Sequence, residues 1–307
     1  MNKGLLKTGI FPIRSISRLE HLLGTGREEL RHIAEAVDSY YAPFDQIRTT
    51  SDGRRKTRRI DNPTGELKKI QAKINGLLST SVFPTDMHGG IPGKSTKSNA
   101  LPHLRQPLVA KIDLKNCFPN TSHRKVFKAF RETLECVNSV ASILTRLTTW
   151  NGCLPQGASS STLLCNLCLL PLRDDISRIS EELALRQTIF VDDITISGIH
   201  TREAIEPIIK MILIHGYSVR NRKVQVMPAS CRQETTGVGL NRKFSVRGNK
   251  YENIRLRILR YNPASKNSQK GLDSIMGFIA HATFINRSQG ASLRRLLSRV
   301  VKKNVVA

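Results

Sequence analysis

Two adjacent aspartates, Asp192 and Asp193, sit in the middle of an alternating apolar segment. Apolar residues alternate from Ile189 to Ile196, which predicts two short strands that meet at the aspartate pair in a tight hairpin. A two-residue hairpin turn favours Asn-Gly or Asp-Gly, because its central residues adopt positive φ. Two like charges in such a turn repel each other. We therefore expect a divalent cation to neutralise them.

The composition points to a polyanionic partner. The chain has 307 residues, enough for one large domain or two to three subdomains. Its 49 Lys and Arg outnumber 24 Asp and Glu, a net charge of +25 that repels itself unless a polyanion binds. Nucleic acid is the leading candidate and an anionic membrane the second. No 18-residue apolar stretch or secretory signal is apparent, so we expect no membrane association.

The six cysteines are scattered and form no evident disulfide framework. Cys165 and Cys168 have CxxC spacing, which a zinc site or a redox motif would share. No second CxxC completes a metal site, and leucines surround the pair, so a buried helix is the favoured interpretation. This usage of cysteine indicates a reducing compartment, and we expect a cytoplasmic protein.

Strand and helix patterns alternate irregularly along the chain. Pro171 should end or kink the helix that Ser159 to Ser161 can cap. This mixed order predicts an α+β fold in which helices back an antiparallel sheet. The expected strands span 108–114, 188–197, 217–226 and 235–240, and the expected helices span 28–40, 67–78, 123–134, 162 onward, 201–215 and most of 250–303.

Asp113 is the candidate for a third carboxylate. It ends an apolar strand 79 residues before Asp192, a position that on its own is more typical of a turn or a cap. Together with the aspartate pair, it could hold two Mg²⁺ ions on adjacent strand ends. One ion would activate a 3′-hydroxyl and the other would bind the leaving pyrophosphate.

Two further segments suggest phosphate or nucleotide contacts. The run from Arg54 to Arg59 holds five cations in six positions, typical of a solvated nucleic-acid surface, and alternate cations of a strand there could reach a triphosphate. The loop Leu154-Pro155-Gln156-Gly157 would allow a ligand to approach closely, although an ordinary helix-start loop looks the same. The glycine-rich segment 89–94 lacks the spacing of a P-loop, so we reject that interpretation.

In this order the segments resemble a reverse transcriptase, and most closely the retron type of bacteria. The resemblance covers about residues 50–260. Phe190-Val191-Asp192-Asp193 stands where the family usually has Tyr-Ala-Asp-Asp. The other matching segments are 56–63 with 66–68, 88–90 through 99–103, 111–119, 154–160, 221–223 and 236–241.

The resemblance implies a right-hand polymerase with an N-terminal helical extension (1–49), fingers (50–105), a palm (106–240) and a basic helical thumb (241–307). Asp113, Asp192 and Asp193 would hold the metals, although direct contact by Asp193 stays open. The implied nucleotide-binding residues are Lys56 and Arg58 at the triphosphate, Phe118 under the sugar, Gln156 and Gly157 along the nucleotide, and Lys223 near the pyrophosphate. The basic thumb residues expected to bind nucleic acid are Arg242, Lys243, Arg247, Lys250, Arg255, Arg294 and Arg295.

These features predict an RNA-directed DNA polymerase that uses dNTPs to copy part of a structured non-coding RNA into single-stranded DNA. The resemblance also implies a bound RNA–DNA product, a role in antiphage defence and an effector protein as partner. Two alternatives remain open. One is another defence-associated reverse transcriptase without a retron RNA, and the other is an RNA-binding scaffold with an inactive polymerase fold.

Overall fold

The fold is organised around a four-stranded antiparallel sheet. The computed structural model describes residues 9–49, 55–220, 224–262 and 268–306. The sheet order is β4 (Arg186–Phe190), β5 (Asp193–Ser197), β3 (Leu108–Asp113) and β6 (Gln225–Pro228). Strands β3 and β5 are almost wholly buried, as their apolar side chains require. Asp113 pairs with Asp193 in the register of β3 and β5, so these two residues lie at the same end of the sheet.

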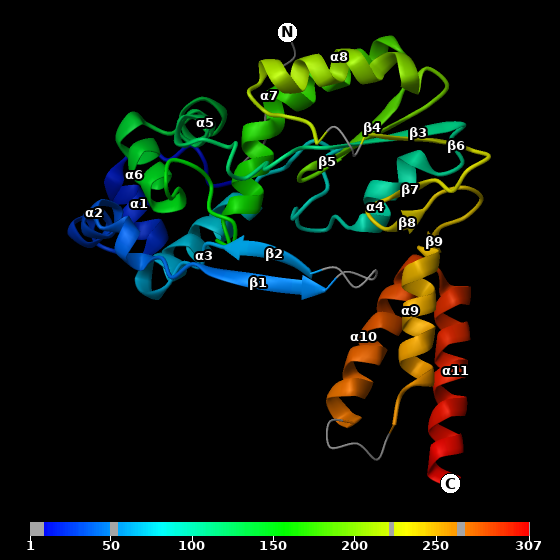
Figure 1. Ribbon diagram of the computed structural model, residues 1–307. Coiled ribbons are helices and arrows are strands. Elements are labelled where there is room, and N and C mark those ends of the chain that lie inside the picture. Colours follow the sequence, from blue (N-terminus) through cyan, green and yellow to red (C-terminus); the bar gives the residue numbers. More distant parts are fainter. Residues whose placement is uncertain (1–8, 50–54, 221–223, 263–267, 307) are drawn as a thin grey trace.

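Helices cover both faces of this sheet (Figure 1). The long helices α7 (Ser161–Glu182) and α8 (Thr201–Ile214) lie over one face. Helix α4 (Thr96–Ala100) and a small sheet of β7 (Glu234–Thr235), β8 (Val238–Gly239) and β9 (Ser245–Val246) lie over the other. The predicted α+β fold with an antiparallel sheet backed by helices is confirmed.

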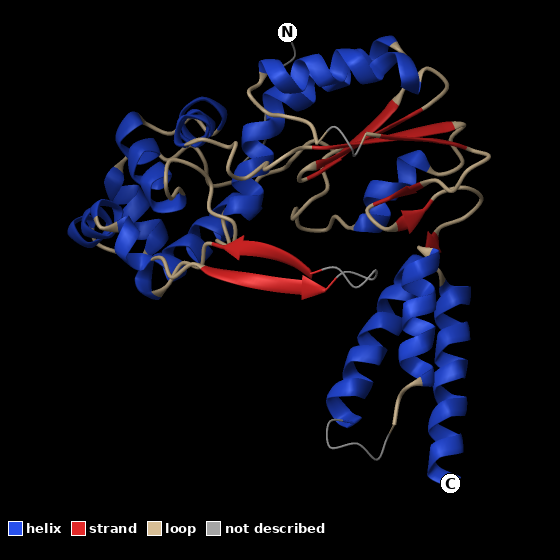
Figure 2. Ribbon diagram, viewed as in Figure 1, coloured by secondary structure: helices blue, strands red, loops and turns tan. Residues whose placement is uncertain are grey.

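The N-terminal part packs against the same core and extends a two-stranded ribbon. Its strands β1 (Phe44–Thr49) and β2 (Arg55–Ile60) pair antiparallel and project away from the helices (Figure 2). The helical elements of this lobe and its neighbours are α1 (Ile16–Leu23), α2 (Arg27–Glu35), η1 (Val37–Tyr40), α3 (Gly65–Ser79), η2 (Leu101–His103), α5 (His123–Lys128), the π-helical η3 (Ala129–Thr133) and α6 (Asn138–Thr148).

Three helices form a C-terminal bundle, and their apolar side chains belong to a second core cluster that also includes Val109 of β3 and Val238 of β8. They are α9 (Gly248–Leu259), α10 (Ser268–Ile285) and α11 (Arg287–Val306). Ile258, Ile279 and Leu293 are buried between them, so the cations of α9 and α11 are left on the outer surface. No helix that the structure describes combines the length and the hydropathy needed to cross a bilayer.

Several local expectations were wrong. The strand expected at 217–226 begins only at Gln225, and before it Val219 forms an isolated bridge to Leu114. Helix α7 continues through Pro171, because buried leucines on both sides of that residue hold the helix in the core. Ser160 occupies the N-cap position of α7 but makes no side-chain capping hydrogen bond. The hydroxyl of Ser161, the first residue of the helix, donates to the Pro155 carbonyl.

The expected helix at 28–40 is also shorter in the structure. Helix α2 ends at Glu35, and the one-turn 3₁₀ helix Val37–Tyr40 follows it. Cys165 is buried in α7, with its sulfur 3.3 Å from that of Cys117. The CxxC spacing is thus part of a core helix, as expected.

Candidate active site

The aspartate hairpin is built from β4 and β5, and its turn differs from the expected one. Phe190 pairs with Asp193, so Val191 and Asp192 form the two-residue turn and Asp193 already belongs to β5. Val191 adopts the left-handed conformation with φ of 57°. This conformation is strained for a β-branched residue and persists only where the surroundings enforce it.

A neighbouring segment supplies that support. The Ile189 amide donates to the Asp86 carbonyl, and the His88 amide donates to the Ile189 carbonyl, both at 2.8 Å. Gly89 comes so close that a Cβ there would lie 2.6 Å from the Val191 amide nitrogen. Only glycine leaves room for the turn at this point.

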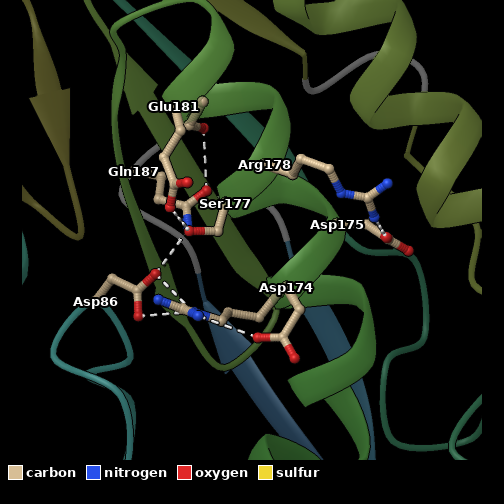
Figure 3. Close-up of polar contacts among 9 residues, drawn as sticks. Asp86, Asp174, Asp175, Ser177, Arg178, Glu181 and Gln187 are labelled. Atoms are coloured by element: carbon tan, nitrogen blue, oxygen red, sulfur yellow. Dashed lines mark hydrogen bonds and ion pairs between the residues drawn. The ribbon is translucent and has the colours of Figure 1, made fainter. Parts of the chain in front are cut away.

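A polar network anchors the same segment to α7 and β4 (Figure 3). The Arg173 guanidinium donates from Nε to both carboxylate oxygens of Asp86, at 2.9 and 3.0 Å. The Gln187 amide also donates to Asp86, at 2.7 Å. Because the pair is largely buried, it fixes the position of the segment that carries Gly89.

The turn opens into a pocket of about 500 Å³ whose walls come from distant parts of the chain. It is lined by five of the predicted site residues together with eight others. The five are Arg58, Phe118, Gln156, Asp192 and Asp193; the others are Thr96, Asn116, Cys117, Thr162, Phe190, Val191, Arg220 and Thr236.

Asp113 lies directly beside the pocket. Its Cα pairs with that of Asp193 across β3 and β5, and its side chain is only 14% exposed. Arg220 Nη1 lies 3.4 Å from Asp113 Oδ1. The structure thus brings the three predicted carboxylates to one end of the sheet, with the Arg220 guanidinium beside Asp113.

The carboxylates suit a divalent cation by their chemistry, since Mg²⁺ and similar ions prefer oxygen ligands and need only a few carboxylates beside phosphate and water. Within the described ranges, no three His, Cys, Asp or Glu side chains converge closely enough to hold an ion by themselves. A metal bound here would need further oxygen ligands from substrate phosphates or water.

The remaining predicted nucleotide-binding residues are placed differently. Lys56 is exposed on β2, two residues before Arg58 and on the same face of the ribbon. Gly157 does not line the pocket but packs against the end of β2, where a Cβ would lie 2.9 Å from Ile60 Cγ2 and 3.0 Å from the Asp61 carbonyl oxygen. Lys223 falls outside the described residues.

The predicted thumb cations lie away from the pocket. Arg242 and Lys243 follow β8, while the others lie at or within α9 and α11. Arg247 Nε is 3.2 Å from Glu234 Oε2, and Arg255 pairs with Glu252 at 2.9 Å. Burial lowers the pKa of Lys250. Arg294 and Arg295 are exposed on α11.

Sequence reasoning missed three residues that shape the site. Asp61 binds the Gln156 backbone, Gly89 makes room for Val191, and Arg220 faces Asp113. Asp61 and Gly89 lie inside matching segments and Arg220 immediately precedes another, but nothing in these segments indicates which residues they contact. Cys117 is a neutral pocket residue, since a hydrogen bond to Cys165 and burial raise the pKa of its thiol.

Known reverse transcriptases are similar to this chain over most of its length. The chain is 26% identical over 307 residues to the Retron Se72 reverse transcriptase of Salmonella heidelberg (strain 579083-10), covering 94% of this chain and 80% of that protein. It is 27% identical over 283 residues to the Retron Ec86 reverse transcriptase of Escherichia coli, covering 90% and 85%. The resemblance to retron-type enzymes is confirmed.

Solved structures also align with the chain. Telomerase from Candida tropicalis gives a TM-score of 0.48 at 10% identity, over 89% of this chain and 65% of that one. The model of the family described as reverse transcriptase (RNA-dependent DNA polymerase) matches residues 48–240, well over half of the chain. This chain belongs to the reverse transcriptase family.

Proposed function

We propose that this chain is the polymerase of a retron and copies part of a structured non-coding RNA into single-stranded DNA. The observation that carries the proposal is the pocket in which Asp192 and Asp193 meet Phe118, Gln156 and Arg58. The similarity to retron reverse transcriptases over most of the chain supports the choice of RNA. The net charge of +25 suits a protein that keeps an RNA–DNA product bound.

Within this proposal the carboxylates hold the metal. Asp113 and Asp192, with Asp193 beside them, would bind two Mg²⁺ ions, which when present lower the pKa of the attacking hydroxyl and neutralise charge on the leaving pyrophosphate. Their position at one sheet end supports this role.

The other residues position the nucleotide. Arg58 and Lys56 lie on one face of the β1–β2 ribbon and would contact the triphosphate, which guanidinium and ammonium groups bind through charge-assisted hydrogen bonds. Phe118 would lie under the sugar and exclude a 2′-hydroxyl. Gln156 would line the incoming nucleotide, and Gly157 would let this loop approach β2 closely. Lys223 would lie near the pyrophosphate.

The proposed division of the chain assigns residues 1–49 to an N-terminal extension, 50–105 to fingers, 106–240 to a palm and 241–307 to a thumb. The C-terminal bundle of α9, α10 and α11, which begins at Gly248, supports a thumb in the last part of the chain. Antiphage defence together with an effector protein completes the proposal and is supported by the resemblance alone.

The test is DNA synthesis on RNA that copurifies with the full chain. We expect sequencing to find one RNA joined to one DNA, and Asp192→Asn to abolish synthesis while RNA binding persists. Asp174→Asn is the matched control, because Asp174 is an exposed carboxylate on α7 that pairs with Arg173 outside the pocket. Retained synthesis in Asp192→Asn would contradict the metal assignment, and a mixture of unrelated RNAs would contradict the retron assignment.

A further inference from the structure

Arg220 is a pocket residue to which the proposed function gives no role. It lines the same pocket as Asp192, Asp193 and Arg58, and its Nη1 lies 3.4 Å from Asp113 Oδ1. A cation so close to carboxylates that are to bind metal ions needs an explanation, because it competes with those ions for the same oxygen atoms.

The backbone fixes the place of Arg220. Its amide donates to the Asp113 carbonyl at 3.0 Å, Val219 forms a bridge with Leu114, and the Lys115 amide donates to the Ser218 carbonyl at 2.7 Å. Residues 218–220 thus continue the pairing of β3 beyond its end. The Cα of Arg220 is therefore fixed at the edge of the site, and every rotamer of the side chain begins from that position.

The guanidinium itself is held loosely. Its distance from Asp113 exceeds the 2.7–3.2 Å typical of an N–H···O hydrogen bond, and the Arg220 side chain is 40% exposed. A structural ion pair would be expected to be shorter and more buried. The long, flexible side chain can therefore leave Asp113 for a stronger anion without disturbing the fold.

The pocket has the charge pattern that a metal-bound polyphosphate requires. Carboxylates lie at the strand ends, while Arg58 enters from the ribbon and Arg220 from the palm sheet. A guanidinium presents paired donors that match phosphate oxygens, and it stays protonated at any physiological pH. Arg220 is thus suited to stabilise phosphate charge and unsuited to donate a proton.

We infer that Arg220 binds the β- and γ-phosphates of the incoming nucleotide and the pyrophosphate formed from them, an inference that rests on the proposed polymerase function. In the reaction the 3′-oxygen bonds to the α-phosphorus and its proton passes to water. The bond from the α-phosphorus to the bridging oxygen breaks, and its electron pair leaves with pyrophosphate. Arg220 stabilises the charge that accumulates on this leaving group.

The experiment measures inhibition of primed RNA-templated synthesis by inorganic pyrophosphate, with the full chain. A charge-assisted hydrogen bond contributes enough that Arg220→Ala should raise the pyrophosphate inhibition constant by roughly tenfold or more. Arg220→Lys should fall between this variant and the wild type, because lysine keeps the charge but loses the paired donors. Arg202→Ala, an exposed arginine on α8, should match the wild type.

The outcomes separate this inference from the proposed function. If wild-type protein incorporates no dNTP, the proposed function itself is contradicted. If the wild type is active and Arg220→Ala keeps its pyrophosphate inhibition constant within about twofold, the role of Arg220 is overturned. A lower kcat with unchanged pyrophosphate inhibition would also overturn it, since a residue that only supports the fold would behave in that way.

Discussion

Asp61 and Gln156 are joined by two hydrogen bonds at the root of the ribbon. The backbone amide of Gln156 donates to Asp61 Oδ2 at 2.8 Å, and the backbone amide of Asp61 donates to the backbone carbonyl of Gln156 at 2.9 Å. The Asp61 side chain is only 19% exposed. These two hydrogen bonds hold the end of β2, the strand that carries Arg58, against the loop that carries Gln156. They therefore fix the distance between the two pocket walls that Arg58 and Gln156 form.

We expect Asp61→Ala to raise the KM for dNTP about tenfold with a smaller effect on kcat. The backbone amide of Gln156 would lose its hydrogen bond to the Asp61 side chain, and the loop that carries Gln156 would shift away from β2. Asp61→Asn should restore most of the affinity, since its amide oxygen can still accept the hydrogen bond. Steady-state kinetics at varied dNTP concentration measures both effects. A KM unchanged in Asp61→Ala would show that the link does not position Gln156.

Gly89 offers a test of the hairpin support. Gly89→Ala should disrupt the Val191 turn and sharply reduce synthesis, because the new Cβ would lie 2.6 Å from a backbone nitrogen that cannot move aside. Gly76→Ala is the control: Gly76 lies within α3, a Cβ there meets no atom within 4 Å, and alanine should stabilise the helix by about 0.5–1 kcal/mol. Equal activity in the two variants would remove Gly89 from this role.

Much of the fold was predictable because apolar periodicity records burial. The segment 108–114 is apolar except for Lys111 and Asp113, as in a largely buried strand, and 189–196 alternates on both sides of the aspartates, so β3, β4 and β5 were expected within a few residues. Residues 217–226 carry a similar pattern, yet of the described residues in this range only Gln225 and Val226 belong to a strand. Apolar periodicity indicates which side chains are buried, but it does not indicate which segments pair as strands.

The site was predictable where a residue carries its own chemistry. Asp113 and Asp192 are acids at strand ends, and such positions can be recognised from sequence. Asp61 and Gly89 act through contacts with residues about 95 and 100 positions away, which no local pattern records. The left-handed turn at Val191 was unexpected for the same reason, because tertiary support outweighs the usual preference for glycine or asparagine.

Phe118 should control sugar discrimination. It lines the pocket with Asp192, and its resemblance to the sugar-contacting aromatic predicts that Phe118→Ala admits ribonucleotides. We expect the ratio of kcat/KM for dNTP over rNTP to fall by about ten- to a hundredfold. Phe118→Tyr keeps the ring and should keep the ratio. Unchanged discrimination in Phe118→Ala would assign the ring to packing alone.

His103 should make stability depend on pH. Its Nδ1 and Nε2 lie 2.7 Å from the Ser197 hydroxyl and 2.9 Å from the Thr188 hydroxyl, and burial lowers its pKa to about 3. Since the folded state disfavours the proton, the contribution of neutral His103 is fully present above about pH 6.5 and is lost as the pH falls from there toward 3.

Urea unfolding of wild type and His103→Gln between pH 7 and pH 4 measures this contribution. The stability advantage of the wild type should shrink by roughly 1 kcal/mol per pH unit below pH 6. A difference between the two proteins that stays constant over this range would contradict the low pKa of His103.

The last helix provides a test of the proposed thumb. Arg294 and Arg295 are exposed on α11, while Leu293 and Leu297 hold that helix in the core, so replacing both arginines by glutamine should leave the fold intact. Each lost phosphate contact should reduce the slope of log affinity against log salt by about 0.9 on a duplex. Fluorescence anisotropy with an RNA–DNA duplex between about 50 and 200 mM salt measures the slope.

A matched loss of charge elsewhere separates contact from general attraction. Arg178 on α7, which pairs with Asp175, and Arg202 on α8 are both exposed on the helices that cover one face of the sheet. Replacing these two by glutamine removes the same two charges, and screening at these salt concentrations limits their effect over distances beyond about 10 Å. Equal slopes in the two double variants would show that α11 attracts nucleic acid only through net charge, whereas a lower slope confined to the α11 variant identifies direct phosphate contacts.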